Sequence, residues 1–195
     1  MEENREYFNG GQPQIPTQAE PVNKFSSAAA EGLKLAAISI IFMLISTLLP
    51  QNTTGGIIGI VITLLKLGAT ITFLWYAMKK YSQRNAAVEG FTTYGKVFSY
   101  GFLTSLLSGI VLAAFTFVNM KFISPESTEA AKDAYLTQMS ALPNIDSGMI
   151  ETLTNNLETI TSFAMLVLAI FYGVIWSLIL ASSTKVNPMN NFNIQ

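Results

Sequence analysis

The 195-residue sequence contains no cysteine and no histidine. Without cysteine, disulfide bonds, thiolate nucleophiles and iron–sulfur clusters are excluded, and without either residue type the usual zinc sites are excluded. The lack of histidine also removes the side chain that most often acts as a general base. No other nucleophile stands beside a base in the sequence, and no phosphate-binding loop occurs in a suitable context. We therefore expect no catalytic residues, no metal site and no cofactor, and a protein that is not an enzyme.

Charge is also scarce, because only 12% of the residues are charged while 50% are hydrophobic. An average soluble domain carries about 25% charged residues. The net charge of −1 gives no electrostatic attraction to nucleic acid, so we expect no nucleic-acid partner. This composition indicates an integral membrane protein whose main contact is the lipid bilayer.

Long apolar segments predict four membrane-spanning helices. A helix needs roughly 20 predominantly apolar residues to cross a hydrocarbon core about 30 Å thick. Each segment is apolar around its whole circumference, as contact with lipid requires. The predicted spans are residues 28–49, 57–78, 97–120 and 160–182. The predicted fold class is therefore all-α, an integral membrane four-helix bundle.

Basic residues near the span ends predict the orientation, because lysine and arginine there resist translocation. They are concentrated before the first span, in residues 79–96 and after the fourth span, whereas residues 121–159 are mainly acidic. Both termini are therefore expected in the cytoplasm. Eight basic residues would lie on that side, namely Arg5, Lys24, Lys34, Lys79, Lys80, Arg84, Lys96 and Lys185, against Lys121 and Lys132 outside.

The two ends of the chain are predicted to be disordered cytoplasmic tails, comprising residues 1–24 and 184–195. Both are polar, and the first contains three prolines. Such segments cannot bury enough apolar surface to offset the entropy of ordering. The four-span transmembrane domain is therefore expected to occupy residues 25–183.

The connection between the third and fourth spans, residues 121–159, is too long to be structureless in a compact protein. Ser124-Pro125-Glu126 has the order typical of a helix start, with a capping hydroxyl, a proline in the first turn and then an acid. Apolar residues at helical spacing follow in two stretches, which predicts a helical hairpin outside the membrane. Because no helix breaker separates its second helix from the fourth span, we expect one continuous helix over residues 147–182.

Small residues recur at every fourth position in two of the spans. Such rows let helix backbones approach closely, which is a main source of association energy in lipid. We expect these rows either to pack the four helices together or to drive dimerisation. The third span contains Gly101, Ser105 and Gly109, and the fourth contains Ala169, Gly173, Ser177 and Ala181.

One basic residue, Lys66, lies near the middle of the second span, where it costs about 2.5–3.5 kcal/mol on insertion scales. No acid lies at similar depth in another span, but Tyr172, Ser105, Ser108 and Thr63 supply hydroxyl groups. Lys66 is therefore either hydrogen-bonded inside the bundle or extended toward the membrane surface. The alternative is a functional site, either an anion or proton pathway or a charge partner for another protein.

The junction of the second and third spans resembles a known family. Lys79-Lys80-Tyr81 is followed by residues 90–101, which read GFTTYGKVFSYG. This pattern, a basic end of one helix before an aromatic–Gly–Lys start of the next, is similar to the bacterial domain of unknown function 4199 family, and the resemblance extends over residues 31–185. It implies a four-helix protein of the bacterial inner membrane with no assigned activity.

The same junction also has a purely structural interpretation. Either Thr92 or Thr93 is placed to cap the third span. Tyr94 and Phe98 are aromatic residues of the kind that gather at the headgroup level, and Lys96 is placed to face lipid phosphates. Membrane anchoring alone therefore explains the motif.

Two functional interpretations remain open from the sequence. The leading one is a structural or accessory subunit of a larger membrane assembly, in contact with other subunits or with copies of itself. The alternative is a small transporter or channel that uses Lys66, although no inverted repeat is evident in the sequence.

Overall fold

The structure is a computed structural model that describes residues 23–49, 56–140 and 147–187. Helices account for most of these residues, and the only β-pairing among them is an isolated bridge. The helices are α1 (Lys24–Leu48), α3 (Ile57–Glu89), α4 (Tyr94–Val118), the π-helix η1 (Asn119–Ile123), α5 (Pro125–Ser140), α6 (Ser147–Asn155) and α7 (Leu157–Thr184). Four of them are long and apolar enough to cross a membrane, namely α1, α3, α4 continued by η1, and α7. The predicted all-α membrane bundle is therefore confirmed.

The helix α3 continues well past the predicted end of the second span. It runs to Glu89 and stops at Gly90, whose φ of 81° is a left-handed conformation that glycine adopts without steric cost. The connection to α4 is therefore much shorter than the loop expected over residues 79–96. Thr93 caps α4 by accepting a hydrogen bond from the backbone N–H of Lys96 at 3.4 Å. It is one of the two threonines predicted to cap this helix.

Both predicted tails extend too far into the fold. Lys24, predicted to belong to the first tail, begins α1 because the asparagine before it caps the helix. The backbone N–H of Thr92 donates to the carbonyl of Val186 at 3.0 Å, so the start of the second predicted tail pairs with the α3–α4 junction. The remaining tail residues, 1–22 and 188–195, lie outside the described part of the chain.

The predicted continuous helix over residues 147–182 is wrong, because the helix breaks at Asn156 between α6 and α7. The Asn156 side chain donates to the carbonyl oxygen of Thr152 at 2.8 Å. Asparagine side chains compete in this way with backbone hydrogen bonds, which disfavours a helix interior. The predicted start of the hairpin at Pro125 is confirmed, and α5 packs on both η1 and α6.

The two rows of small residues face each other across the α4–α7 interface, the most extensive one in the molecule. A Cβ atom added to Gly109 would lie 2.5 Å from the Cβ of Ala169, and one added to Gly173 would lie 2.7 Å from the Cβ of Ser105. Such separations show that the two backbones approach as closely as glycine permits. Ala181, the last member of its row, is fully buried.

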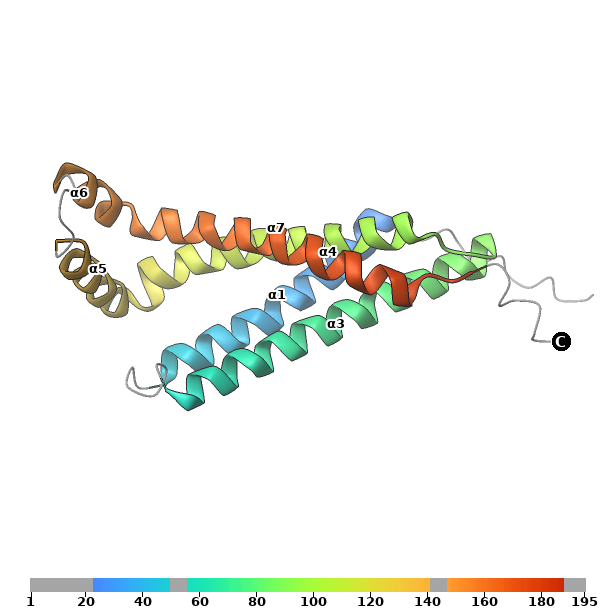
Figure 1. The fold of residues 1–195 in the computed structure, drawn as a ribbon, viewed down its shortest axis with the longest axis horizontal. Helices are drawn as coiled ribbons and strands as arrows, with labels where there is room; N and C mark the ends of the chain where they lie inside the picture. The colour runs from blue at the N-terminus through green and yellow to red at the C-terminus, as the bar shows by residue number, and fades with distance from the viewer. Residues whose placement is uncertain (1–22, 50–55, 141–146, 188–195) are drawn as a thin grey trace, which may run out of the picture.

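The helices diverge along the bundle. The buried residues of α1 lie at residues 28–39, mostly in its first half, and those of α3 lie at residues 70–85, mostly in its second half. Figure 1 shows the reason: all four long helices meet at one end, and toward the α5–α6 end α1 and α3 separate from α4 and α7. We call the pair α1 and α3 one arm and the pair α4 and α7 the other.

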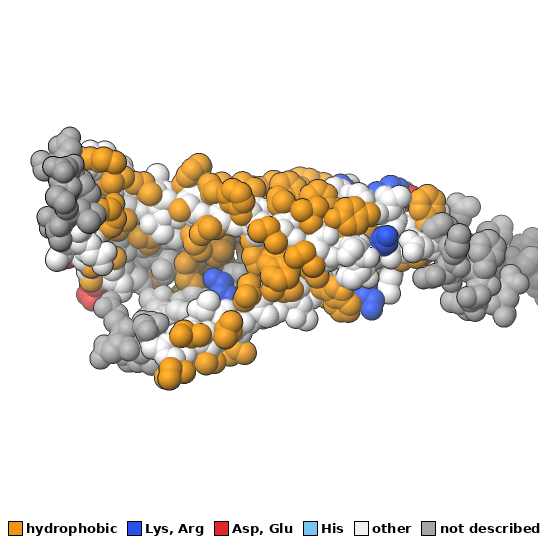
Figure 2. Space-filling model, viewed as in Figure 1, with side chains coloured by type: hydrophobic (Ala, Val, Ile, Leu, Met, Phe, Trp, Pro, Cys, Tyr) orange, Lys and Arg blue, Asp and Glu red, His pale blue; other side chains and the backbone are white. Residues whose placement is uncertain are grey.

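The two ends of the bundle also differ in charge. In Figure 2, apolar side chains cover much of the middle of the molecule, and basic side chains gather toward the end where α3 and α7 finish. We call this the basic end. The opposite end carries α5 and α6 and is called the hairpin end.

Candidate functional site

A cavity of about 520 Å³ lies between the two arms. Each of the four long helices contributes to its wall, so the cavity exists only because the arms diverge. Its polar lining residues are Ser39, Thr63, Lys66, Thr70, Ser105, Ser108 and Tyr172, and its apolar ones are Leu35, Leu67, Gly109, Leu112, Met165, Leu168, Ala169 and Phe171. The volume falls within the ~300–1,000 Å³ range of small-molecule binding sites.

The structure brings together all the residues of the predicted intramembrane polar site. Lys66 from α3, Ser105 and Ser108 from α4, and Tyr172 from α7 line this one cavity. Ser105 and Ser108 are almost completely buried, and Lys66 is half-buried. A mostly apolar wall with a few convergent polar groups is typical of a ligand site.

The partners of Lys66 differ from those expected. Within the described part of the chain, its ammonium group forms neither an ion pair nor a hydrogen bond with a side chain. Tyr172, a predicted partner, instead shares a hydrogen bond of 2.9 Å with Thr70. Lys66 therefore lies beside the cavity with unused hydrogen-bonding capacity. An unpaired cation in a membrane-spanning helix is costly.

A second unused group lies in the same cavity wall. The Ser105 Oγ is buried and has no hydrogen-bond partner among the described residues. A buried hydroxyl without a partner costs about 1–3 kcal/mol. The Ser105 Oγ packs beside Gly173 in the α4–α7 interface, so it is Lys66 that offers a charged group to an anion in the cavity.

Sequence reasoning missed Thr70 and Ser39, which also line the cavity. The hydroxyl of Thr70 lies 2.9 Å from the carbonyl oxygen of Lys66, one helical turn away, as well as bonding Tyr172. The four-residue spacing from Lys66 was the signal that could have identified Thr70. Ser39 lies on α1, and no sequence pattern relates it to Lys66.

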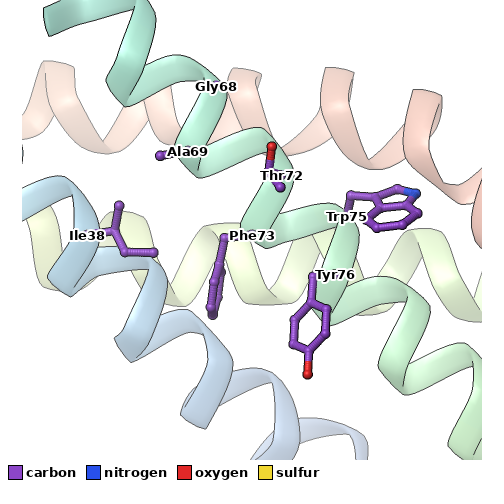
Figure 3. Close-up of a pocket in the computed structure, with 7 residues that line it drawn as sticks. All are labelled: Ile38, Gly68, Ala69, Thr72, Phe73, Trp75 and Tyr76. Atoms are coloured by element: carbon purple, nitrogen blue, oxygen red, sulfur yellow. The ribbon is translucent and has the colours of Figure 1, made fainter.

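A different hollow, of about 500 Å³, lies on the outer face between α1 and α3. Figure 3 shows Ile38 from α1 facing α3, where Gly68 and Ala69 leave the helix surface low next to the larger Phe73, Trp75 and Tyr76. None of the described residues that line this hollow is charged, so it offers lipid a surface of matching polarity and nothing to select an ion.

Glu31 at the basic end, unlike Lys66, is paired. The buried carboxylate of Glu31 lies 3.0 Å from the Nζ of Lys80 and 3.2 Å from that of Lys34. Beside it, the rings of Tyr81 and Tyr100 stack with their centroids 4.0 Å apart. This end is therefore a closed, well-packed junction of α1, α3 and α4.

At the hairpin end, Lys132 ties the extramembrane helices to the bundle. Its Nζ lies 2.9 Å from the carboxylate of Glu158 on α7 and 3.0 Å from that of Glu129 on its own helix, α5. These hydrogen bonds raise the pKa of Lys132 above its usual value, and the bond to Glu158 contributes most. The hairpin is therefore held on α7 by an ion pair as well as by the chain connection at Asn156.

The fold and the cavity define a multi-pass α-helical membrane protein with a polar site inside its apolar region. The chain matches the family model described as protein of unknown function DUF4199 over residues 31–185, and it belongs to that family. No curated protein and no solved structure matches the chain.

Proposed function

We propose that this chain is a small, non-enzymatic transporter that binds an anionic substrate at Lys66. The observation that carries the proposal is the ammonium of Lys66, unpaired among the described residues, beside a cavity of about 520 Å³ between two diverging arms. Transporters of several folds bind their substrates near the bilayer midplane, at the interface of two halves that rock against each other. The two arms, joined at the basic end, provide such halves.

The proposal places the chain in the inner membrane of a bacterium, with the basic end in the cytoplasm. The family resemblance supports the membrane, and the excess of lysine at the basic end supports the orientation. The cavity would then be closed on the cytoplasmic side, where Glu31 and Lys80 pair, and wider on the outer side. This arrangement corresponds to an outward-facing state.

The test is to identify the small molecules that stay bound when the full chain is purified from native membranes in mild detergent. We expect an anionic compound in near-stoichiometric amount in the wild type and in Lys79→Met, and its loss in Lys66→Met. Lys79 lies on the same helix but packs over Trp75, away from the cavity. Equal amounts of every anionic compound in all three preparations would contradict the proposal.

An accessory subunit of a larger assembly is the second candidate, supported by the α5–α6 hairpin that Lys132 and Glu158 hold at one end of the bundle. An ordered helical pair beyond the spans offers a surface to a partner protein or to another copy of the chain. The native mass of the same preparation distinguishes the two functions. A stoichiometric protein partner retained equally by wild type and Lys66→Met would favour the accessory subunit.

A further inference from the structure

We propose that the anionic substrate is a fatty acid, a single alkyl chain with a carboxylate head that pairs with Lys66. This inference rests on the proposed function and specifies its substrate class. The head would lie at Lys66, and the chain would lie along the apolar wall formed by α4 and α7.

The polar groups of the cavity suit one small head of single charge. Among the described residues that line the cavity, Lys66 is the only charged one. A carboxylate accepts hydrogen bonds at both oxygens, and charge-assisted bonds are roughly twice as strong as neutral ones.

The apolar part of the cavity suits an alkyl chain that enters from the bilayer. Leu112, Met165, Leu168 and Phe171 form a continuous apolar lining on α4 and α7. Leu168 and Phe171 are each 62% exposed, so the cavity opens sideways toward lipid. A small inorganic anion would gain nothing from this wall, whereas an alkyl chain matches its polarity and fills it.

A transmembrane helix of another protein fits the cavity less well. An α-helix with side chains is about 10 Å wide. Running the length of the bundle, it would have to pass between Thr70 and Tyr172, whose oxygens lie 2.9 Å apart. This separation leaves no room for a helix between the two arms at that point.

The experiment measures palmitate binding to the purified full chain by native mass spectrometry, with hexadecanol as the uncharged ligand of equal length. We expect at least tenfold weaker binding of hexadecanol than of palmitate, which corresponds to about 1.4 kcal/mol. Lys66→Met should lose at least the same factor, Lys66→Arg should restore most of it, and Lys79→Met should bind as the wild type does. Removing a charge from a span lowers its insertion cost, so Lys66→Met is expected to fold.

A second measurement locates the bound chain. The protein contains two tryptophans. Trp176 lies next to the cavity, its ring 6.2 Å from that of Tyr172, whereas Trp75 lines the outer hollow of Figure 3. In a Trp75→Phe background, a brominated fatty acid should quench Trp176 fluorescence, and palmitate but not hexadecanol should reverse the quenching.

Three results would overturn the inference: hexadecanol binding as tightly as palmitate, Lys66→Met binding palmitate as the wild type does, or an anionic phospholipid binding more tightly than palmitate in a Lys66-dependent manner. Retention of a different anion from native membranes at Lys66 would disprove the fatty acid and leave the proposed transporter standing. If the wild type neither binds palmitate nor retains an anion from native membranes, both the fatty acid and the proposed transporter are disproved.

Discussion

The phenol oxygen of Tyr172 on α7 lies 2.9 Å from the Oγ1 of Thr70 on α3, and this hydrogen bond joins the two arms beside Lys66. Thr70 is buried, and α3 and α7 have far less contact with each other than α4 and α7 do. The bond therefore helps to set how far the arms separate, and with it the width of the cavity.

Tyr172→Phe should destabilise the bundle, because it removes the hydroxyl that links the arms and leaves their packing nearly unchanged. Hydrogen bonds between membrane helices contribute about 0.6 kcal/mol on average and up to about 1.7 kcal/mol. The measurement is the free energy of unfolding in mixed micelles. Tyr76→Phe is the control, since Tyr76 is exposed on the outer face and its hydroxyl has no partner among the described residues. An equal loss in both variants would contradict the linking role.

Glycine substitutions should change the stability of the bundle differently depending on which face carries the glycine. Gly173→Leu should destabilise it by about 1–3 kcal/mol, the usual cost of overpacking, because a Cβ there already meets Ser105 at 2.7 Å. Gly68→Ala meets nothing within 4 Å and should leave stability unchanged or raise it by up to about 1 kcal/mol. Unfolding of both variants in the same micelles checks the difference. A destabilised Gly68→Ala would show that the outer hollow is occupied.

The hairpin should detach from α7 when its ion pair is broken. Glu158→Gln removes the contact of Lys132 with the bundle, whereas Glu129→Gln removes only a contact within α5. We expect faster amide hydrogen exchange in α5 for Glu158→Gln, and little change for Glu129→Gln. Similar exchange in the two variants would show that α5 is held by its packing on η1 instead.

The ion pair of Lys132 also predicts that the attachment of α5 to the bundle weakens at high pH. The carboxylates of Glu158 and Glu129 raise the pKa of Lys132 above its usual 10.5. A raised pKa in the folded state means that the stabilisation is complete below pH 10.5 and is lost as the pH rises through the higher folded value. Protection of α5 from proteolysis should therefore persist to pH 10 and decline above 10.5, and Lys132→Met should abolish this decline.

The orientation is testable because the chain contains no cysteine. Ala87→Cys near the basic end and Ser127→Cys at the start of α5 both introduce thiols at exposed positions. In intact cells, a membrane-impermeant maleimide should label residue 127 and should label residue 87 only after lysis. Labelling of residue 87 from outside would reverse the proposed orientation.

Much of the fold followed from local sequence. Composition and the length of the apolar runs predicted four spans, because a hydrocarbon core about 30 Å thick accepts only long apolar helices. The four-residue spacing of small residues placed Gly109 and Ala169 in rows that meet across one interface. Ser124 and Pro125 marked the start of α5 correctly. The break at Asn156 was missed, since one side chain competing for a backbone carbonyl leaves no trace in the hydrophobic pattern.

By itself, the sequence determined that this is a helical membrane protein with one unmatched cation at mid-depth, because the cost of charge in lipid makes Lys66 stand out wherever the helices lie. Only the tertiary structure decided what surrounds Lys66. Ser39, Thr70, Ser105 and Tyr172 come from four helices and meet around one cavity because the arms diverge from a packed basic end. The angle between the arms arises from close backbone packing between distant segments, and no local spacing encodes it.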